Sequence, residues 1–213
     1  MTPTSKLSLG LLLTACAGFI DAVGFIELGG LYTSFMSGNT TQLGAALAEA
    51  APSLILLPAS LIAMFFAGAF LGSLAATLGD RWGPSATLGV VVIAIAVSIA
   101  LSLSGFSSGQ AMVVLAFAAG SQNAVLRSNG AARLGATFVT GTLFSAGQDL
   151  ALAIRRLAPP FRWLQHLLVW AALLVGAGVG AAVYALLGIP ALLLPMAVYA
   201  VLFLAVTLRR AIA

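Results

Sequence analysis

Long apolar runs with almost no charged residue dominate this chain. Six of them have spanning length, since about 20 helical residues cross the roughly 30 Å hydrocarbon core of a bilayer. Nine basic and five acidic residues are the only formal charges in 213 residues, and the mean hydropathy is +1.14. So few charges cannot cover a globule in water, which excludes a soluble enzyme, a secreted domain and a disordered chain. The six predicted spans lie at about 8–27, 54–78, 86–104, 110–127, 164–187 and 191–208.

Two further segments, about 35–49 and 138–154, are shorter and more polar than the six spans. Each opens with a glycine motif, Ser37-Gly38-Asn39-Thr40 in the first and Thr140-Gly141-Thr142 in the second. A helix over residues 38–49 would run only about 18 Å, which is too short to cross the membrane. The segments are therefore expected either to re-enter the membrane as half-helices or to form short complete spans.

The positions of the basic residues distinguish these two alternatives, because cytoplasmic loops of membrane proteins are enriched in Lys and Arg. If both short segments re-enter and the N-terminus is cytoplasmic, all nine basic residues lie inside. If both segments cross, Arg81, Arg127 and Arg133 fall outside, which leaves six of the nine inside. The rule therefore favours six full spans with both termini cytoplasmic.

The two halves of the chain also resemble each other. Residues 18–23 align with 120–125 at an offset of 102, and Phe35-Met36-Ser37-Gly38 aligns with Phe138-Val139-Thr140-Gly141 at 103. Farther on, Gly68 and Gly72 align with Gly176 and Gly180 at 108. Each half then reads as span, half-helix, span, span. Three crossings are an odd number, so the halves would enter the membrane from opposite sides, as in many transporters and channels.

The predicted fold is an all-α, polytopic membrane helix bundle that forms a single transmembrane domain over residues 1–213. It consists of six full spans plus two short or re-entrant half-helices. We expect two inverted structural repeats, at about 8–105 and 109–209.

The repeated motifs resemble a known family. Residues Gly18-Phe19-Ile20-Asp21-Ala22-Val23-Gly24-Phe25, followed by Phe35-Met36-Ser37-Gly38-Asn39-Thr40, are similar to the signature of the YoaK-like family of bacterial membrane proteins. The second-half residues 120–124 and 139–143 resemble that family's second motif. Ser37 stands where such a motif commonly carries Thr and keeps its hydroxyl. The resemblance implies a multi-pass protein of the bacterial inner (plasma) membrane and implies no substrate, since the family has no established activity.

The glycine motifs provide the main candidate site. A half-helix that begins inside the membrane leaves its first backbone N–H groups without water or a helical partner. In one interpretation Ser37 and Thr140 are N-caps whose hydroxyls accept these N–H bonds. In the other, two opposed helix N-termini bind a small anionic or neutral solute. The predicted solute-binding residues are Asp21, Ser37, Gly38, Asn39, Thr40, Gln122, Asn123, Thr140, Gly141 and Thr142.

Two acidic residues are candidates for proton coupling. Asp21 lies inside the first span, where a charge costs about 2.5–3.5 kcal/mol on insertion scales. Its alternative role is a structural hydrogen bond to Asn39 or Thr40. Asp149 lies in the second short segment, and its alternative role is an interfacial ion pair with an arginine at 155–156. The other three acids are at segment ends, where solvent is expected to reach them.

The sequence predicts neither an enzyme nor a cofactor. The chain has one cysteine, Cys16, and one histidine, His166, so it lacks a Ser/His/Asp set and a metal-ligand cluster. Its scattered basic residues predict no binding of nucleic acid. We predict a transporter or channel for a small polar or anionic solute, with its site at the midplane between two half-helix N-termini. The alternative is a non-transporting assembly or lipid-interacting factor. The expected partners are the lipid bilayer and the solute, and a homo-oligomer is left open.

Overall fold

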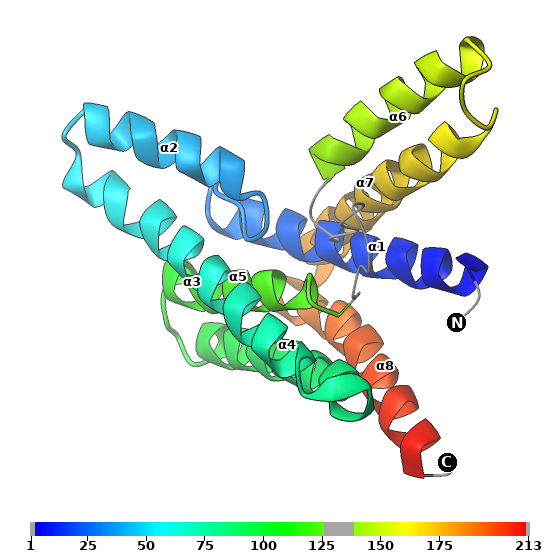
Figure 1. Cartoon of the computed structure of the whole chain (residues 1–213). Helices are drawn as coiled ribbons and strands as arrows, with labels where there is room; N and C mark the ends of the chain where they lie inside the picture. The colour runs from blue at the N-terminus through cyan, green and yellow to red at the C-terminus, as the bar shows by residue number, and fades with distance from the viewer. Residues whose placement is uncertain (1–2, 126–138, 212–213) are drawn as a thin grey trace.

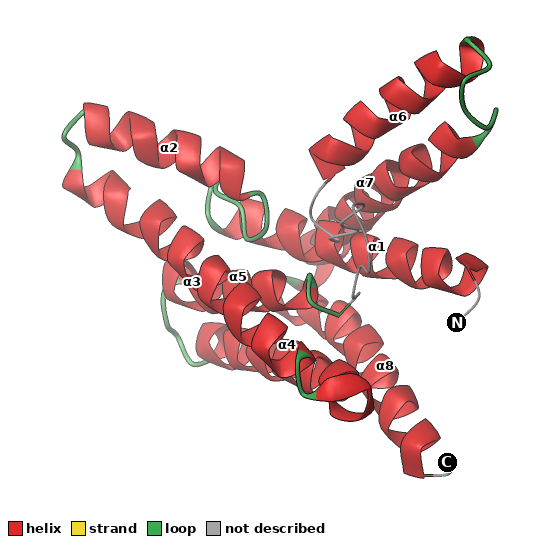
Figure 2. Ribbon diagram, viewed as in Figure 1, coloured by secondary structure: helices red, strands yellow, loops and turns green. Residues whose placement is uncertain are grey.

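The computed structural model describes residues 3–125 and 139–211. Within these ranges the chain folds into helices joined by short loops, without a strand (Figure 2). The all-α membrane bundle expected from the hydropathy pattern is therefore confirmed. The elements are α1 (Pro3–Glu27), α2 (Met36–Ala48), α3 (Pro52–Ala76), α4 (Gly79–Leu103), α5 (Ser108–Gln122), α6 (Val139–Ile154), α7 (Arg162–Leu187), the 3-10 helix η1 (Ile189–Leu192) and α8 (Leu193–Ala211).

Five segments in the described ranges are long and apolar enough to cross a membrane. They belong to α1, α3, α4, α7 and the continuous run of η1 and α8. The sixth predicted span, about 110–127, corresponds to α5, which has 15 residues and ends at Gln122. The end of this predicted span, beyond Val125, lies outside the described residues, so the count of six spans stays a prediction.

The two short predicted segments fold as separate helices of the expected extent. α2 has 13 residues and α6 has 16, which correspond to about 20 Å and 24 Å of helix. In Figure 1, α2 starts near the middle of the molecule and runs in the same direction as α1 toward one edge. α6 starts near the middle and runs in the same direction as α5 toward the opposite edge. Each short helix then turns back and packs against the next one, α2 against α3 and α6 against α7.

Glycines allow α1 and α7 to cross with their backbones in contact. A Cβ atom on Gly176 would lie 2.0 Å from the carbonyl oxygen of Ala15. A Cβ atom on Gly18 would lie 2.3 Å from the carbonyl oxygen of Leu173. No side chain fits at such distances, so small residues here allow close helix packing.

α3 and α5 pack in the same way. A Cβ atom on Gly68 would lie 2.0 Å from the carbonyl oxygen of Phe117, and one on Gly120 would lie 2.1 Å from that of Phe65. These contacts correspond residue by residue to those between α1 and α7, at the offsets found in the sequence. The corresponding pairs are Gly18 and Gly120, Ala15 and Phe117, Gly68 and Gly176, and Phe65 and Leu173.

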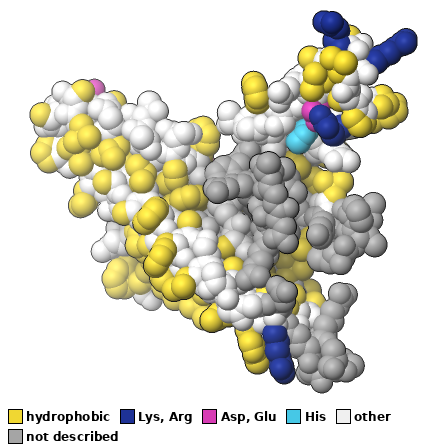
Figure 3. Space-filling view, in the orientation of Figure 1, with side chains coloured by type: hydrophobic (Ala, Val, Ile, Leu, Met, Phe, Trp, Pro, Cys, Tyr) yellow, Lys and Arg dark blue, Asp and Glu magenta, His cyan; other side chains and the backbone are white. Residues whose placement is uncertain are grey.

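The surface is that of a protein surrounded by lipid. Large apolar side chains are widely exposed, among them Phe66 at 73%, Ile93 at 65% and Leu186 at 83%. Figure 3 shows hydrophobic side chains across the visible face and basic ones at two of its corners. Figure 1 shows both chain ends, the α3–α4 turn and the α6–α7 turn toward the same side. Arg81 lies in the first turn of α4, Arg155 and Arg156 follow α6, and Arg162 begins α7. Arg127 and Arg133 lie outside the described residues.

Candidate functional site

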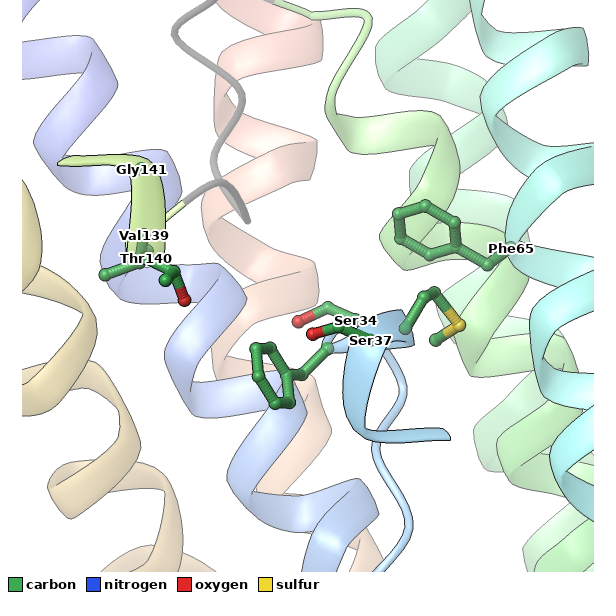
Figure 4. Close-up of a pocket in the computed structure, with 8 residues that line it drawn as sticks. Ser34, Ser37, Phe65, Val139, Thr140 and Gly141 are labelled. Atoms are coloured by element: carbon green, nitrogen blue, oxygen red, sulfur yellow. The ribbon is translucent and has the colours of Figure 1, made fainter. Parts of the chain in front are cut away.

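The N-terminal turns of α2 and α6 face each other across a cavity of about 280 Å³. In Figure 4, Val139, Thr140 and Gly141 stand on one side, and Ser34 and Ser37 point toward them from the other. The arrangement thus brings together two segments that the sequence placed in different halves of the chain. The remaining described residues of the wall are Phe35, Met36 and, from α3, Phe65.

Of the ten predicted solute-binding residues, three line this cavity: Ser37, Thr140 and Gly141. Ser37 is the second residue of α2, and Thr140 and Gly141 are the second and third described residues of α6. Ser34 and Phe65 also line the cavity and were not predicted. Ser34 could have been suspected from the sequence, because it lies three residues before the Ser37 motif. Phe65 could not, because it lies in an ordinary apolar span. The other seven predicted residues are not among the described wall residues.

The prediction that Ser37 is an N-cap is wrong. α2 begins at Met36 with Phe35 at the N-cap position, and no side chain in the described part of the molecule caps this helix. The N–H groups of Gly38 and Asn39 instead donate to the carbonyl oxygen of Phe35, at 3.1 and 3.4 Å. The Ser37 hydroxyl is therefore free of a capping role and stands on the cavity wall. Thr140 is likewise the second residue of α6 and not its N-cap.

Asn39, Thr40 and Gly38 shape the approach to α2. The Asn39 side chain is fully buried and bonds twice to Tyr32, accepting from its N–H at 2.9 Å and donating to its carbonyl oxygen at 2.7 Å. The Thr40 hydroxyl donates to the carbonyl oxygen of Met36 at 2.8 Å. A Cβ atom on Gly38 would lie 3.0 Å from the Tyr32 ring, so glycine admits that ring. Asn39 thus holds the loop before α2 and Gly38 leaves room for it, whereas Thr40 bonds within α2.

Asp21 also binds this loop. Its Oδ1 accepts from the backbone N–H of Thr33 at 2.9 Å, the Thr33 hydroxyl at 3.1 Å and the backbone N–H of Ser34 at 2.8 Å. The predicted hydrogen bond to Asn39 or Thr40 is therefore wrong. The loop between α1 and α2 lies closer to Asp21, and its residues Thr33 and Ser34 donate to the carboxylate instead. Asp21 is not among the described wall residues of the cavity, but it is hydrogen-bonded to Ser34, which is one of them.

The second-half candidates Gln122, Asn123 and Thr142 bond within the bundle. Gln122 is 1% exposed, and its Oε1 accepts a short hydrogen bond from the hydroxyl of Tyr199 in α8. The Asn123 amide donates to the carbonyl oxygen of Ala119 at 3.2 Å. The Thr142 hydroxyl donates to the carbonyl oxygen of Val139 at 2.6 Å. Gln122 thus connects α5 to α8, whereas these bonds of Asn123 and Thr142 go to residues of the same helix.

Asp149 forms an ion pair with an arginine, as in its predicted alternative role, and the partner is Arg162 instead of Arg155 or Arg156. Arg162 Nε donates to its Oδ2 at 2.7 Å and a second guanidinium nitrogen donates to Oδ1. His166 Nε2 lies 3.3 Å from the same Oδ2. The Arg162 guanidinium holds the pKa of the Asp149 carboxyl below its usual range. The cluster ties α6 to α7 at the corner where Figure 3 shows a histidine beside acidic and basic side chains.

Glu27 was expected to be a solvated residue at the end of a span, but the structure shows that its side chain bonds to two other helices. Its Oε1 accepts a short hydrogen bond from the hydroxyl of Tyr184, and its Oε2 accepts from the Ser108 hydroxyl at 2.6 Å. Glu27 thus connects α1 to α7 and α5. A tyrosine in an apolar span was the available signal, since a tyrosine hydroxyl in such a place usually has a partner.

The apolar spans, the lipid-facing surface and the glycine-mediated crossings define a polytopic helical membrane protein. A family model described as "Protein of unknown function (DUF1275)" matches residues 9–205, and the chain therefore belongs to this family. The resemblance seen in the sequence motifs is thereby confirmed.

Two curated relatives are transmembrane proteins by name. The chain is 31% identical over 186 residues to the UPF0700 transmembrane protein RA0705 of Rhizobium meliloti (strain 1021), which covers 83% of this chain and 76% of that protein. It is 23% identical over 146 residues to the UPF0700 transmembrane protein YoaK of Bacillus subtilis (strain 168), covering 66% of this chain and 65% of YoaK. The match thus spans just under two thirds of the length of YoaK. No solved structure matches the chain.

Proposed function

We propose that this protein is a transporter or channel for a small polar or anionic solute, which binds between the N-terminal turns of α2 and α6. The observation that carries the proposal is that Ser37, from the first half of the chain, and Thr140 and Gly141, from the second half, line the same cavity. Helix N-termini carry partial positive charge, and the hydroxyls of Ser37 and Thr140 add hydrogen-bond donors. The described wall contains no acidic side chain. Such a site suits a solute that is anionic or rich in hydrogen-bond acceptors.

The proposal includes two inverted repeats with the site between them. The matched glycine contacts of the α1–α7 and α3–α5 crossings support it, as do the opposite directions of α2 and α6 (Figure 1). In this arrangement α5 is the sixth span and the two short helices re-enter from opposite faces. The basic residues at the start of α4 and after α6 then lie on the cytoplasmic face of a bacterial inner membrane, together with both termini.

Solute flux through purified protein in proteoliposomes tests the proposal. Chloride and nitrate entry is followed with an entrapped anion-quenched dye, and glycerol and urea entry by stopped-flow light scattering. We expect at least one of these probes to enter faster than in protein-free vesicles. The double variant Ser37→Ala, Thr140→Ala should lower that flux, because it removes two hydroxyls from the cavity wall. Thr41→Ala, on α2 but outside the wall, is the matched control. Rates equal to those of protein-free vesicles for all four probes would contradict the proposal.

A non-transporting assembly or lipid-interacting factor is the second candidate. It is favoured by the hydrogen bonds of Asp21 and Asn39, because both side chains bond to residues of the loop before α2. In that case the hydroxyls of Ser37 and Thr140 have only a structural role in the packing of α2 and α6. Folded protein without flux, together with a Ser37→Cys variant that reacts with no maleimide from either face, would support this candidate instead.

A further inference from the structure

A second cavity, of about 400 Å³, lies between α1 and α7, away from the α2 and α6 motifs. Small residues of the two crossing helices line it, including Gly18, Ala22, Ala177 and Ala181. Its volume falls within the roughly 300–1,000 Å³ typical of small-molecule sites. We call this cavity the α1–α7 groove.

Asp21 is the acidic residue of this groove, and the described residues of its wall include no Lys, Arg or His. Thr33 and Ser34 hold the Asp21 carboxyl on the side of the loop: three hydrogen bonds end on Oδ1, and the Ser34 side chain also bonds to this group. A carboxylate inside a span normally has a cationic partner or faces a polar path. Asp21 gives the groove a negative charge, and the described wall contains no cationic side chain to balance it. A cationic ligand could therefore serve as the counter-ion.

Two aromatic side chains complete the groove. The rings of Phe25 and Tyr32 both line it, with centroids 5.0 Å apart. Phe25 is 41% exposed, so its ring is accessible rather than packed into the core. Aromatic rings attract weakly hydrated organic cations such as quaternary ammonium ions. A metal cation is a poor match for this wall, because it requires several oxygen ligands and Asp21 is the single carboxylate described there.

We propose that the α1–α7 groove binds a lipophilic organic cation. The Asp21 carboxylate is its counter-ion, and Phe25 and Tyr32 pack against its apolar substituents. The small residues at the crossing leave the space that the ligand occupies. This site does not depend on solute transport between α2 and α6, since the groove has its own wall and its own charge.

Equilibrium binding of tritiated tetraphenylphosphonium to the purified full-length protein tests this proposal. Saturable binding is defined by displacement with unlabelled tetraphenylphosphonium. We expect Asp21→Asn to lower the affinity at least tenfold, while the asparagine oxygen still accepts hydrogen bonds from the loop. We expect Phe25→Ala to lower it several-fold, because one of the two aromatic rings is lost. Glu49→Gln removes an exposed acid outside the groove and should bind as the wild type does.

Two further measurements separate a charged site from simple partition into an apolar surface. Tetraphenylborate has nearly the same shape and the opposite charge, and it should not displace the cation. Ala181→Leu fills the groove without touching the hydrogen bonds of Asp21, and it should abolish saturable binding in protein that remains folded by size exclusion. Wild-type affinity in Asp21→Asn or in folded Ala181→Leu overturns the proposal. So does equal displacement by tetraphenylborate, or an equal loss in Glu49→Gln. If Asp21→Asn does not fold, Phe25→Ala and Ala181→Leu decide the outcome.

Discussion

Ser34 donates its backbone N–H to the Asp21 carboxylate at 2.8 Å and also lines the cavity between α2 and α6. Asp21 itself lines the α1–α7 groove. One hydrogen bond therefore connects the two cavities through the loop before α2. A change that releases this loop from α1 is expected to affect both of them.

The first prediction concerns the anchoring of this loop. Asp21→Ala removes the acceptor of two backbone N–H groups, at Thr33 and Ser34, whose residues are 0% and 7% exposed. Each buried N–H group left without a partner costs about 1–3 kcal/mol. Asp21→Asn keeps an oxygen at the same place. In thermal unfolding in detergent, we expect a clear loss of Tm for Asp21→Ala and a smaller one for Asp21→Asn. Equal Tm values for Asp21→Ala and the wild type would contradict this role of Asp21.

The second prediction concerns the proposed solute path. Gly141 lines the cavity between α2 and α6, and a Cβ atom there would meet no atom of the described residues within 4 Å. Gly141→Leu should therefore place its side chain in the cavity without strain and lower the flux of a transported probe at least tenfold. Gly147→Leu is the matched control, since Gly147 is in the same helix, has equally open space and does not line the cavity. Equal flux in the two variants would remove the cavity from the path.

The extent of the helices could be predicted from the sequence, because hydropathy and glycine motifs reflect local constraints. The short segments predicted at 35–49 and 138–154 fold as α2 and α6 with bounds that differ by about one residue. The offsets of Gly68 and Gly176 correctly indicated equivalent positions. They did not indicate that α3 crosses α5 and α7 crosses α1, because a repeat reports equivalence and not contact.

The partners of the acidic residues could not be predicted, because they depend on loop conformation. Gly29 and Gly30 have positive φ angles, and the loop they begin turns back to present Thr33 and Ser34 to Asp21. The α6–α7 turn likewise contains Arg156 at φ 58° and directs the chain back along α6. Arg162 and His166 are four residues apart on one face of α7, and that face meets Asp149. Hydropathy patterns carry no information on such turns.

The third prediction concerns the glycine contacts. Gly176→Ala places a Cβ atom 2.0 Å from the backbone of Ala15, which cannot move aside as a side chain would. Overpacking of this kind costs about 1–3 kcal/mol, so the Tm should fall. Gly178→Ala is the matched control on the same helix, where a Cβ atom has open space. If the two halves are equivalent, Gly68→Ala should lower the Tm by a similar amount. A loss for Gly176→Ala no greater than for Gly178→Ala would contradict the close crossing.

The fourth prediction concerns topology. If α2 re-enters the membrane, the turn between α2 and α3 lies outside and the turn between α6 and α7 lies in the cytoplasm. In a Cys16→Ala background, Ser53→Cys should react with a membrane-impermeant maleimide at the periplasmic face of the cell. Ala158→Cys should react only after the inner membrane is permeabilised. Labelling of Ser53→Cys from the cytoplasmic side alone would instead indicate that α2 crosses completely, which would also remove the inverted repeat.

The fifth prediction concerns the ion pair between α6 and α7. The Asp149 side chain is 10% exposed, and the Arg162 guanidinium lowers its pKa from an ordinary value of about 3.9. A carboxyl with a lowered pKa in the folded state stabilises the fold at pH values above its unfolded pKa, and this contribution is lost as the pH falls through the folded pKa. Asp149→Asn should therefore lower the Tm at about pH 6, and its difference from the wild type should shrink below about pH 4.

Two controls distinguish this pair from general surface charge. Arg162→Gln removes the other partner and should reproduce the pH profile of Asp149→Asn. Arg155→Gln removes an exposed positive charge seven residues earlier in the chain and should leave the Tm close to that of the wild type at each pH. Since α6 supplies one wall of the cavity and Arg162 fixes its far end, Arg162→Gln should also lower the flux of a transported probe. A difference between Asp149→Asn and the wild type that stays constant down to about pH 3 would show that packing, and not the ion pair, holds α6 against α7.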